Sequence, residues 1–245
     1  MRDYLRREQA GFAILLRSVP ATVVTLFVVS VISMNLLANK TLVQLPWIAL
    51  DGGMLISWLS FMCMDIITRH FGPKAANQIT VLAAAINVLT CLIFYIASAI
   101  PSNAADYTAF DSILGGTWFI LLGSTVAFLS SGVINNSLNH ALGRLFRRDP
   151  HGKLAYAVRT YVSTFVGQFM DNFIFSVTVF MYFAPRYWDG FHWTLLQCAM
   201  CALTGAAAEL TMEILFSPMG YRICRRWRES AVGREYLDYM GRNDA

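Results

Sequence analysis

Long apolar runs separated by short polar segments are the main pattern along this chain. Within each run the apolar residues follow neither the alternation of a half-buried strand nor a heptad repeat, and a helix needs about 20 such residues to cross a bilayer. The short segments between the runs hold prolines, glycines and charges, which favour turns in water. The pattern predicts an all-α, polytopic membrane protein, a bundle of six transmembrane helices at residues 18–39, 50–68, 75–100, 113–138, 157–183 and 193–217.

The composition agrees with a membrane protein and excludes an ordinary soluble domain. Of the 245 residues, 56% are hydrophobic and only 14% are charged, whereas soluble domains are about 25% charged. Basic residues gather in both terminal segments and in the loops after the second and fourth spans, while Lys40 and Arg186 stand alone on the opposite side. By the positive-inside rule, both termini are cytoplasmic. We expect a basic tail at residues 1–17, one six-helix transmembrane domain at 18–220 and a second basic tail at 221–245.

Several partner and reaction classes are excluded by the same features. The basic segment RICRRWR follows directly on a span, so it indicates contact with anionic lipid headgroups and no nucleic acid. The chain carries no Walker A, H-E-x-x-H or G-x-S-x-G motif. The pair Cys198 and Cys201 has no second C-x-x-C or histidine cluster beside it. We therefore expect no enzyme, no metal site and no cofactor, and a lipid bilayer as surroundings.

Polar side chains inside the predicted spans are the candidate functional residues, because a charge at the centre of a membrane helix costs about 2.5–3.5 kcal/mol. In the fifth span, Arg159, Ser163 and Asp171 fall within about 120° of one another, and Gln168 lies about 60° further round the helix. One side of this helix is therefore polar from its cytoplasmic end to mid-membrane. Asp171, the deepest charge, faces either a structural ion partner or a ligand or proton pathway.

The first two spans carry polar residues at their ends. Asn35 and Asn39 are four apart on one face, where they either bond a neighbouring helix or face a ligand, and Lys40 can snorkel to the outer surface. At the far end of the second span, Asp65 and Arg69 are also four apart and can pair. The second span opens with a Gly-Gly pair that suits a turn or a partly unwound start.

The fourth and sixth spans carry small and polar residues. Small residues in the fourth span allow a close approach of neighbouring helices, and Asn136 belongs to its polar inner end. In the sixth span, Glu209 and Glu213 are expected to pair with Arg222 or Arg225 as structural contacts. The small residues of the fourth span are Gly123, Ser124, Ala127, Ser131 and Gly132.

Three segments together resemble the queuosine precursor transporter family, also called the putative vitamin uptake transporter family. The first, DGGMLISWLSFMCMDIITRHFGPKAA, matches through Gly52, Gly53, Asp65, Thr68, Arg69, Phe71, Gly72, Lys74 and Ala75. The second, VRTYVSTFVGQFMDNFIF, matches through Arg159, Ser163, Thr164, Gly167, Gln168, Asp171 and Phe175. The third, NLLANK, matches through Asn35 and Lys40. The resemblance covers roughly residues 18–220, in the family's order.

The resemblance implies uptake of a 7-deazaguanine precursor of the tRNA base queuosine, such as 7-cyano-7-deazaguanine, across the bacterial inner membrane. A flat, amide-rich base suits carboxylate and amide partners at mid-membrane with aromatic faces for stacking, such as Phe61, Phe169, Trp58 and Trp118. Energy coupling stays open between facilitated diffusion, proton symport through Asp65 or Asp171, and a separate energy-coupling partner; a homo-oligomer is equally open. The substrate-binding residues that we predict are Asp171, Gln168, Ser163, Arg159, Asp65, Asn35, Asn136 and Lys40.

The chain departs from the family's pattern at a few positions, which affects the substrate more than the fold. Arg69 stands where many relatives have Glu, Asn136 where many have Asp, and Asn172 where Ser or Thr is usual. Ser57 and Trp58 stand where Phe-Pro is common. The alternatives are therefore the same architecture carrying a vitamin or another nucleobase, or a non-transport membrane scaffold or intramembrane enzyme.

Overall fold

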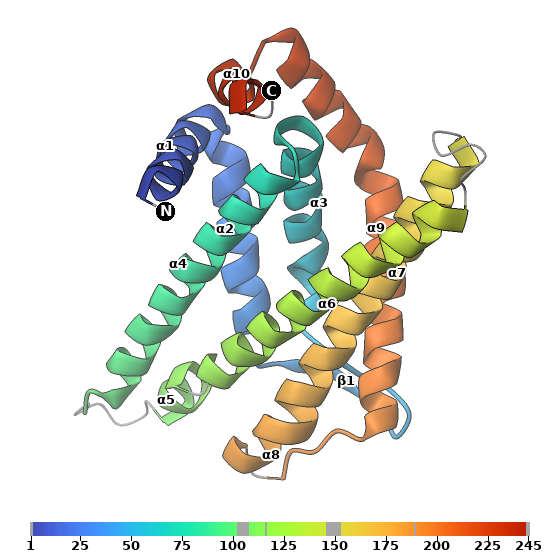
Figure 1. The fold of residues 1–245 in the computed structure, drawn as a ribbon. Coiled ribbons are helices and arrows are strands. Elements are labelled where there is room, and N and C mark those ends of the chain that lie inside the picture. Colours follow the sequence, from blue (N-terminus) through green and yellow to red (C-terminus); the bar gives the residue numbers. More distant parts are fainter. Residues whose placement is uncertain (1, 102–107, 116, 146–152, 189, 244–245) are drawn as a thin grey trace. The chain divides into compact units, whose positions relative to one another are not determined.

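The protein is almost entirely helical, and each predicted span overlaps a long helix (Figure 1). The computed structural model describes residues 2–101, 108–115, 117–145, 153–188 and 190–243. The helices of the first half are α1 (Arg2–Ser18), α2 (Ala21–Leu37), α3 (Met54–Phe71), α4 (Pro73–Ala99) and α5 (Thr108–Gly115). Those of the second half are α6 (Thr117–Leu145), α7 (Lys153–Ser176), the π-helix η1 (Val177–Phe183), α8 (Ala184–Tyr187), α9 (Leu195–Glu229) and α10 (Arg234–Asn243).

The number of membrane spans is established only in part. Within the described ranges, Pro73–Ala99 and Leu195–Phe216 are long and apolar enough to cross a bilayer. A third span results if Arg6–Ser18 and Ala21–Leu37, which meet at 101°, count as one broken span. The count of six and the cytoplasmic termini stay predictions.

Two parts of the sequence prediction are corrected by the fold. The second span was predicted from residue 50, but α3 begins at Met54, and the residues before it form a strand and a turn. Strands β1 (Thr41–Gln44) and β2 (Ala49–Asp51) pair as an antiparallel hairpin, with a register irregularity between Thr41 and Val43. The protein is therefore not strictly all-α, and the Gly-Gly pair makes the turn that the sequence suggested.

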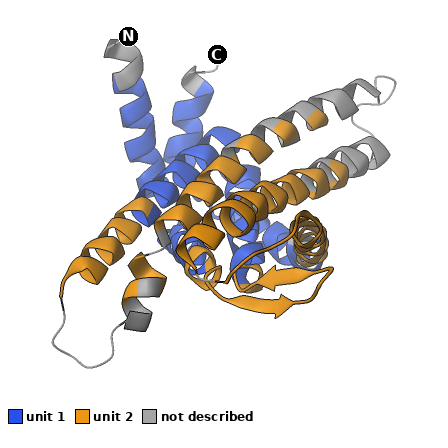
Figure 2. Cartoon of the chain, turned by 90° about the horizontal axis from the view of Figure 1, so that it is seen from below, with its two compact units in different colours: residues 1–33, 56–87, 213–245 blue, residues 34–55, 88–212 orange. Residues whose placement is uncertain are grey.

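The chain divides into two compact units (Figure 2). Unit 1 consists of residues 1–33, 56–87 and 213–245, and unit 2 of residues 34–55 and 88–212. Unit 1 holds the terminal helices α1 and α10 together with the turn between α3 and α4. Unit 2 holds the hairpin, α6, α7, η1 and the first half of α9.

The turn between α3 and α4 follows directly from its sequence. Gly72 has a φ of +88°, the left-handed conformation that commonly ends a helix, and its N–H bonds the Thr68 carbonyl at 2.9 Å. Pro73 then occupies the first position of α4, where a missing N–H is harmless. Just before this turn, Phe71 is 5% exposed and belongs to the core of unit 1.

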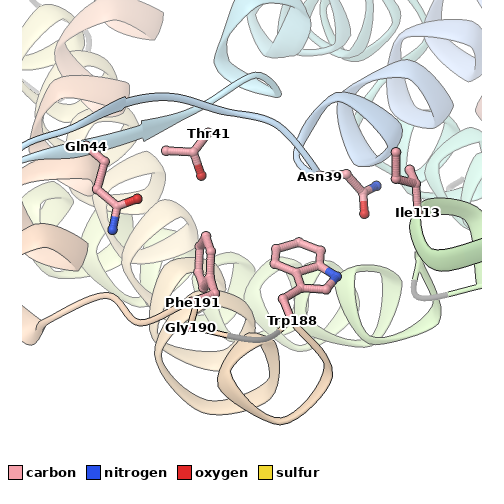
Figure 3. Close-up of a pocket in the computed structure, with 7 residues that line it drawn as sticks. All are labelled: Asn39, Thr41, Gln44, Ile113, Trp188, Gly190 and Phe191. Carbon is pink, nitrogen blue, oxygen red and sulfur yellow. The ribbon is translucent and has the colours of Figure 1, made fainter. Parts of the chain in front are cut away.

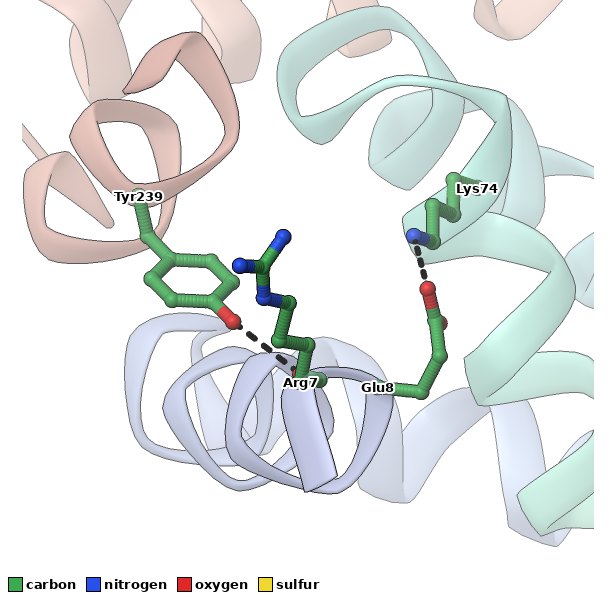
Figure 4. Close-up of polar contacts among 4 residues, drawn as sticks. All are labelled: Arg7, Glu8, Lys74 and Tyr239. Carbon is green, nitrogen blue, oxygen red and sulfur yellow. Dashed lines mark hydrogen bonds and ion pairs between the residues drawn. The ribbon is translucent and has the colours of Figure 1, made fainter. Parts of the chain in front are cut away.

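The terminal helices of unit 1 are attached to this turn by polar contacts (Figure 4). Lys74 pairs with Glu8 at 2.7 Å, and the Tyr239 hydroxyl donates to the Arg7 carbonyl at 3.0 Å. His70 Nε2 lies 2.9 Å from the Val232 carbonyl oxygen. Three motif positions of the first segment, Phe71, Gly72 and Lys74, therefore have a structural role.

The hairpin of unit 2 is fixed to the end of α2. The Gly52 N–H donates to the Lys40 carbonyl at 2.8 Å, and a Cβ at Gly52 would lie 2.6 Å from the Leu37 carbonyl oxygen. Only glycine allows this approach, since a side chain would overlap backbone atoms. The glycine motif therefore closes the hairpin onto α2.

An aromatic cluster packs in the same core as the hairpin of unit 2. Phe119, Phe180 and Trp193 are completely buried, and the Phe180 and Trp193 rings lie 4.2 Å apart. Gly123 of α6 has no space for a side chain, because a Cβ there would overlap Val179 of η1. The predicted close approach at the small residues of the fourth span is confirmed at this glycine.

The first prediction compares two left-handed glycines of unit 1. Gly72→Ala should destabilise the protein by about 1–2 kcal/mol through backbone strain alone, because a Cβ there meets no atom within 4 Å. Gly233→Ala has the same type of φ, +70°, but its Cβ would also overlap the buried Phe71 ring. It should therefore cost roughly a further 1–3 kcal/mol.

The measurement is the apparent melting temperature of each variant in detergent micelles. The larger fall is expected for Gly233→Ala. Equal falls for the two variants would show that the turn before α10 does not press on the Phe71 ring.

Candidate functional site

Buried polar side chains of unit 2 follow one face of α7 and one face of α9. On α7, Gln168, Asn172 and Ser176 recur every four residues, and on α9, Cys201 and Glu209 are eight apart with Gly205 between them. A spacing of four places side chains one above the other on a helix. We call Gln168, Asp171, Asn172, Ser176, Cys201 and Glu209 the polar seam.

The middle of the polar seam is a side-chain contact between α7 and α9. Asn172 Nδ2 donates to Glu209 Oε2 at 3.4 Å, and Glu209 is 5% exposed. Opposite Asn172 lies Gly205, where a Cβ would come within 2.8 Å of Asn172 Nδ2. The glycine therefore makes room for the Asn172 amide.

The seam continues to the hairpin at the other end of α7. Cys201 Sγ lies 4.0 Å from Asp51 Oδ2. Gln197, one turn earlier on α9, donates through Nε2 to the Leu45 carbonyl at 2.7 Å. The hairpin is thus attached to the first turns of α9 at two points.

Asp51 is an acidic group that the sequence prediction missed. It lies at the end of β2, before α3 begins, and its Oδ1 accepts the Gly53 N–H at 2.7 Å. Burial raises the pKa of the Asp51 carboxyl to about 6, although backbone hydrogen bonds, including that of Gly53, oppose the rise. The available signal was a carboxylate directly before a Gly-Gly turn.

Asp171 is half-buried and faces α6. Ser131 of α6, 8% exposed, donates its hydroxyl to Asp171 Oδ1 at 2.8 Å. Among the residues that the structure describes, no basic side chain forms an ion pair with Asp171, and its Oδ2 has no hydrogen-bond partner. The carboxylate therefore keeps one oxygen that can accept hydrogen bonds from a ligand.

Two buried amides also have unused hydrogen-bonding groups. Gln168 Oε1 on α7 and Asn35 Nδ2 on α2 are buried without a partner in the described part of unit 2. A buried polar atom left unsatisfied costs about 1–3 kcal/mol, so such atoms need an explanation. A solute or water accepted by these groups would supply it.

The structure describes the side chains of four of the eight predicted site residues. Gln168 and Asp171 both belong to the polar seam, Asn35 is buried at 2% exposure near the end of α2, and Lys40 is exposed directly before the hairpin. The side chains of four others lie outside the described residues, so their roles, and the expected Asp65–Arg69 pair, stay predictions. These four are Asp65, Asn136, Arg159 and Ser163.

One described partner of Glu209 is the Asn172 amide, and Arg225 pairs with Glu229 at 2.8 Å. The side chain of Glu213 lies outside the described residues, so the expected pairing of Glu209 and Glu213 with Arg222 or Arg225 stays a prediction. Three of the expected stacking surfaces, Trp58, Trp118 and Phe169, have ring partners, and Trp58 stacks on Phe216 within unit 1 with centroids 4.6 Å apart.

A second polar site of unit 2, which the sequence prediction did not find, is a pocket beside the hairpin (Figure 3). It measures about 400 Å³, and we call it the hairpin pocket. Asn39, Thr41 and Gln44 lie opposite Trp188 and Phe191, and Ile113 and Gly190 complete the lining. The sequence signal for it was weak, because Trp188 also fits an interfacial aromatic residue.

Comparison with known proteins identifies the family. The model of the putative vitamin uptake transporter family matches residues 51–223. A protein of Bacillus subtilis (strain 168), named "Probable queuosine precursor transporter", is 28% identical over 129 residues, 51% of this chain and 54% of that protein. The chain therefore spans about half the length of this curated relative, and no solved structure gave a significant match. The chain belongs to the putative vitamin uptake transporter family.

Proposed function

We propose that the chain imports a queuosine precursor, 7-cyano-7-deazaguanine or a related 7-deazaguanine base, across the bacterial inner membrane. The base is bound at the polar seam, among Asp171, Gln168 and the amides beside them. The observation that carries this proposal is a pair of acceptors on one helix, Asp171 Oδ2 and Gln168 Oε1, that have no partner among the described residues. The name of the Bacillus relative supports the same substrate class.

The chemistry of such a base fits these acceptors. The guanine-type edge presents neighbouring N–H donors, and a carboxylate accepts them in charge-assisted hydrogen bonds, which are about twice as strong as neutral ones. Gln168 Oε1 can accept another N–H, and Asn35 Nδ2 can donate to a carbonyl oxygen. Because the α7 acceptors are fixed in a folded helix, little ordering is needed when the base binds.

The second candidate is the same transport architecture with a vitamin or another nucleobase as its substrate. Asn172 favours this alternative, because it brings a larger amide, held by Glu209, to a position where a hydroxyl residue is usual. A panel of ligands tested for thermal stabilisation would separate the two, since a ligand that binds only the folded state raises the melting temperature.

The main prediction concerns uptake. Cells that cannot make queuosine precursors should accumulate labelled 7-cyano-7-deazaguanine when they express this chain, and queuosine should return to their tRNA. Cells with the empty vector are the control. Expression at the membrane without uptake of this base would overturn the assignment and leave the ligand panel to identify another substrate.

A matched pair of acidic residues tests the role of Asp171. Asp171→Asn keeps the shape of the side chain but removes the charge, so uptake should fall at least about tenfold, the loss expected of a charge-assisted bond. Asp238→Asn on α10, whose carboxylate is exposed and pairs with Arg234, should leave uptake unchanged. Folding of both variants is checked by their melting temperatures, and equal uptake would argue against Asp171 as a ligand.

The contact between α7 and α9 gives a further test with two glycines of α9. Gly205→Ala should push Asn172 away from Glu209 and lower uptake roughly several-fold, because displaced groups lose their geometry. Gly220→Ala meets only Ile66, at an ordinary 3.5 Å, and should be neutral or slightly stabilising. Adding Asn172→Ser to Gly205→Ala makes room again and should restore uptake; a double variant no better than the single one would contradict this explanation.

A further inference from the structure

We propose that the hairpin pocket is a separate recognition site, where a flat, uncharged, amide-bearing heterocycle binds before it reaches the polar seam. The proposal rests on the proposed transport function and adds a binding site to it. The volume of about 400 Å³ falls in the range of about 300–1,000 Å³ that is usual for small-molecule pockets.

The aromatic wall of the pocket is suited to a planar solute. The rings of Trp188 and Phe191 lie 5.1 Å apart at 82°, so they form a corner with the face of one ring beside the edge of the other. A flat base can stack on one ring and meet the edge of the second, the two geometries that aromatic pairs prefer. Both rings are half-buried, so part of each remains available.

The two rings of this wall pack against buried aromatic residues. Trp188 makes an edge contact with the buried Phe119, with centroids 5.3 Å apart, and Phe191 lies 5.8 Å from Phe180. Phe119 and Phe180 are both completely buried. Rings supported in this way lose little freedom when a ligand stacks on them, which favours binding.

The opposite wall supplies the hydrogen bonds. Asn39 Nδ2 is engaged with the Leu36 carbonyl at 3.0 Å, but its Oδ1 is buried and has no partner in the part of unit 2 that the structure describes. Thr41 adds a hydroxyl and Gln44 an exposed carboxamide, on the side of the pocket opposite Trp188 (Figure 3). The lining residues that the structure describes are all uncharged, which suits a neutral solute.

The hairpin links this pocket to the polar seam. Strand β1 lines the pocket through Thr41 and Gln44, while β2 ends at Asp51, which contacts Cys201 of the seam. In the chain, Lys40 directly precedes Thr41 of one wall, and Arg186 stands two residues before Trp188 of the other. The sequence assigns these two cations to the outer side of the membrane. The pocket therefore receives the solute on the outer side, and the seam carries it further.

The test uses the full chain in cells and measures initial uptake of 7-cyano-7-deazaguanine against its concentration. Trp188→Leu removes the stacking ring and should raise KM roughly tenfold, with Vmax nearly unchanged, because base–aromatic stacking is lost at the first site only. Trp188→Phe keeps a ring and should stay within about threefold of the wild type. Gln44→Ala, at an exposed position, should raise KM about threefold.

The matched control is Trp47→Leu. Trp47 lies in the loop of the same hairpin, is 53% exposed and does not line the pocket, so its removal should leave KM within about twofold. Surface expression of every variant is measured by immunoblotting of membranes, and folding by melting temperature.

The possible outcomes separate the two proposals. No uptake by the wild-type chain overturns the proposed function and the pocket proposal with it. Uptake by the wild type with unchanged KM in Trp188→Leu and Gln44→Ala overturns the pocket proposal alone. If Trp188→Leu does not fold, Gln44→Ala alone tests the pocket proposal, and an unchanged KM of this variant overturns it. A raised KM in the pocket variants, but not in Trp47→Leu, supports it.

Discussion

The cost of burying polar groups without water is the constraint on which unit 2 depends. Each buried donor or acceptor must be paired inside the protein or by something that the protein binds. Asn172 and Glu209 satisfy this condition between α7 and α9, and Ser131 satisfies it for one oxygen of Asp171. Gln168 Oε1 and Asn35 Nδ2 do not, among the described residues. The paired groups fix the helices, and the unused ones are available to a solute.

The residues that carry the family resemblance divide in the same way. The motif positions around Gly72 end one helix, begin the next and attach the terminal helices, so they preserve a fold whatever the substrate is. Gly52 closes the hairpin onto α2. Gln168 and Asp171, by contrast, each keep one acceptor without a partner among the described residues. Substrate choice is therefore expected to follow the α7 residues and the pocket more than the glycine motif.

The sequence predicted the helices well because long apolar runs leave few alternatives in a membrane. It also singled out Asp171 and Gln168 as candidate ligands, because a polar residue in an apolar run is conspicuous, and their role stays a prediction. It missed the hairpin at residues 41–51, whose short strands carry no clear alternation, and it missed the contact of Asn172 with Glu209. Contacts such as Asn172 to Glu209, 37 positions apart, depend on how two helices meet, which a single sequence does not specify.

The π-helix between Ser176 and Ala184 has a consequence for any map drawn on the fifth span. Its hydrogen bonds reach one residue further than those of an α-helix, so each of its turns contains an extra residue. A helical wheel continued from Asn172 through Tyr187 at a constant angle therefore loses phase after Ser176. An α-helical period therefore assigns the wrong direction to side chains after Ser176, up to Trp188. A cysteine-accessibility scan of this segment has to be interpreted with an α-helical period before Ser176 and a π-helical period after it.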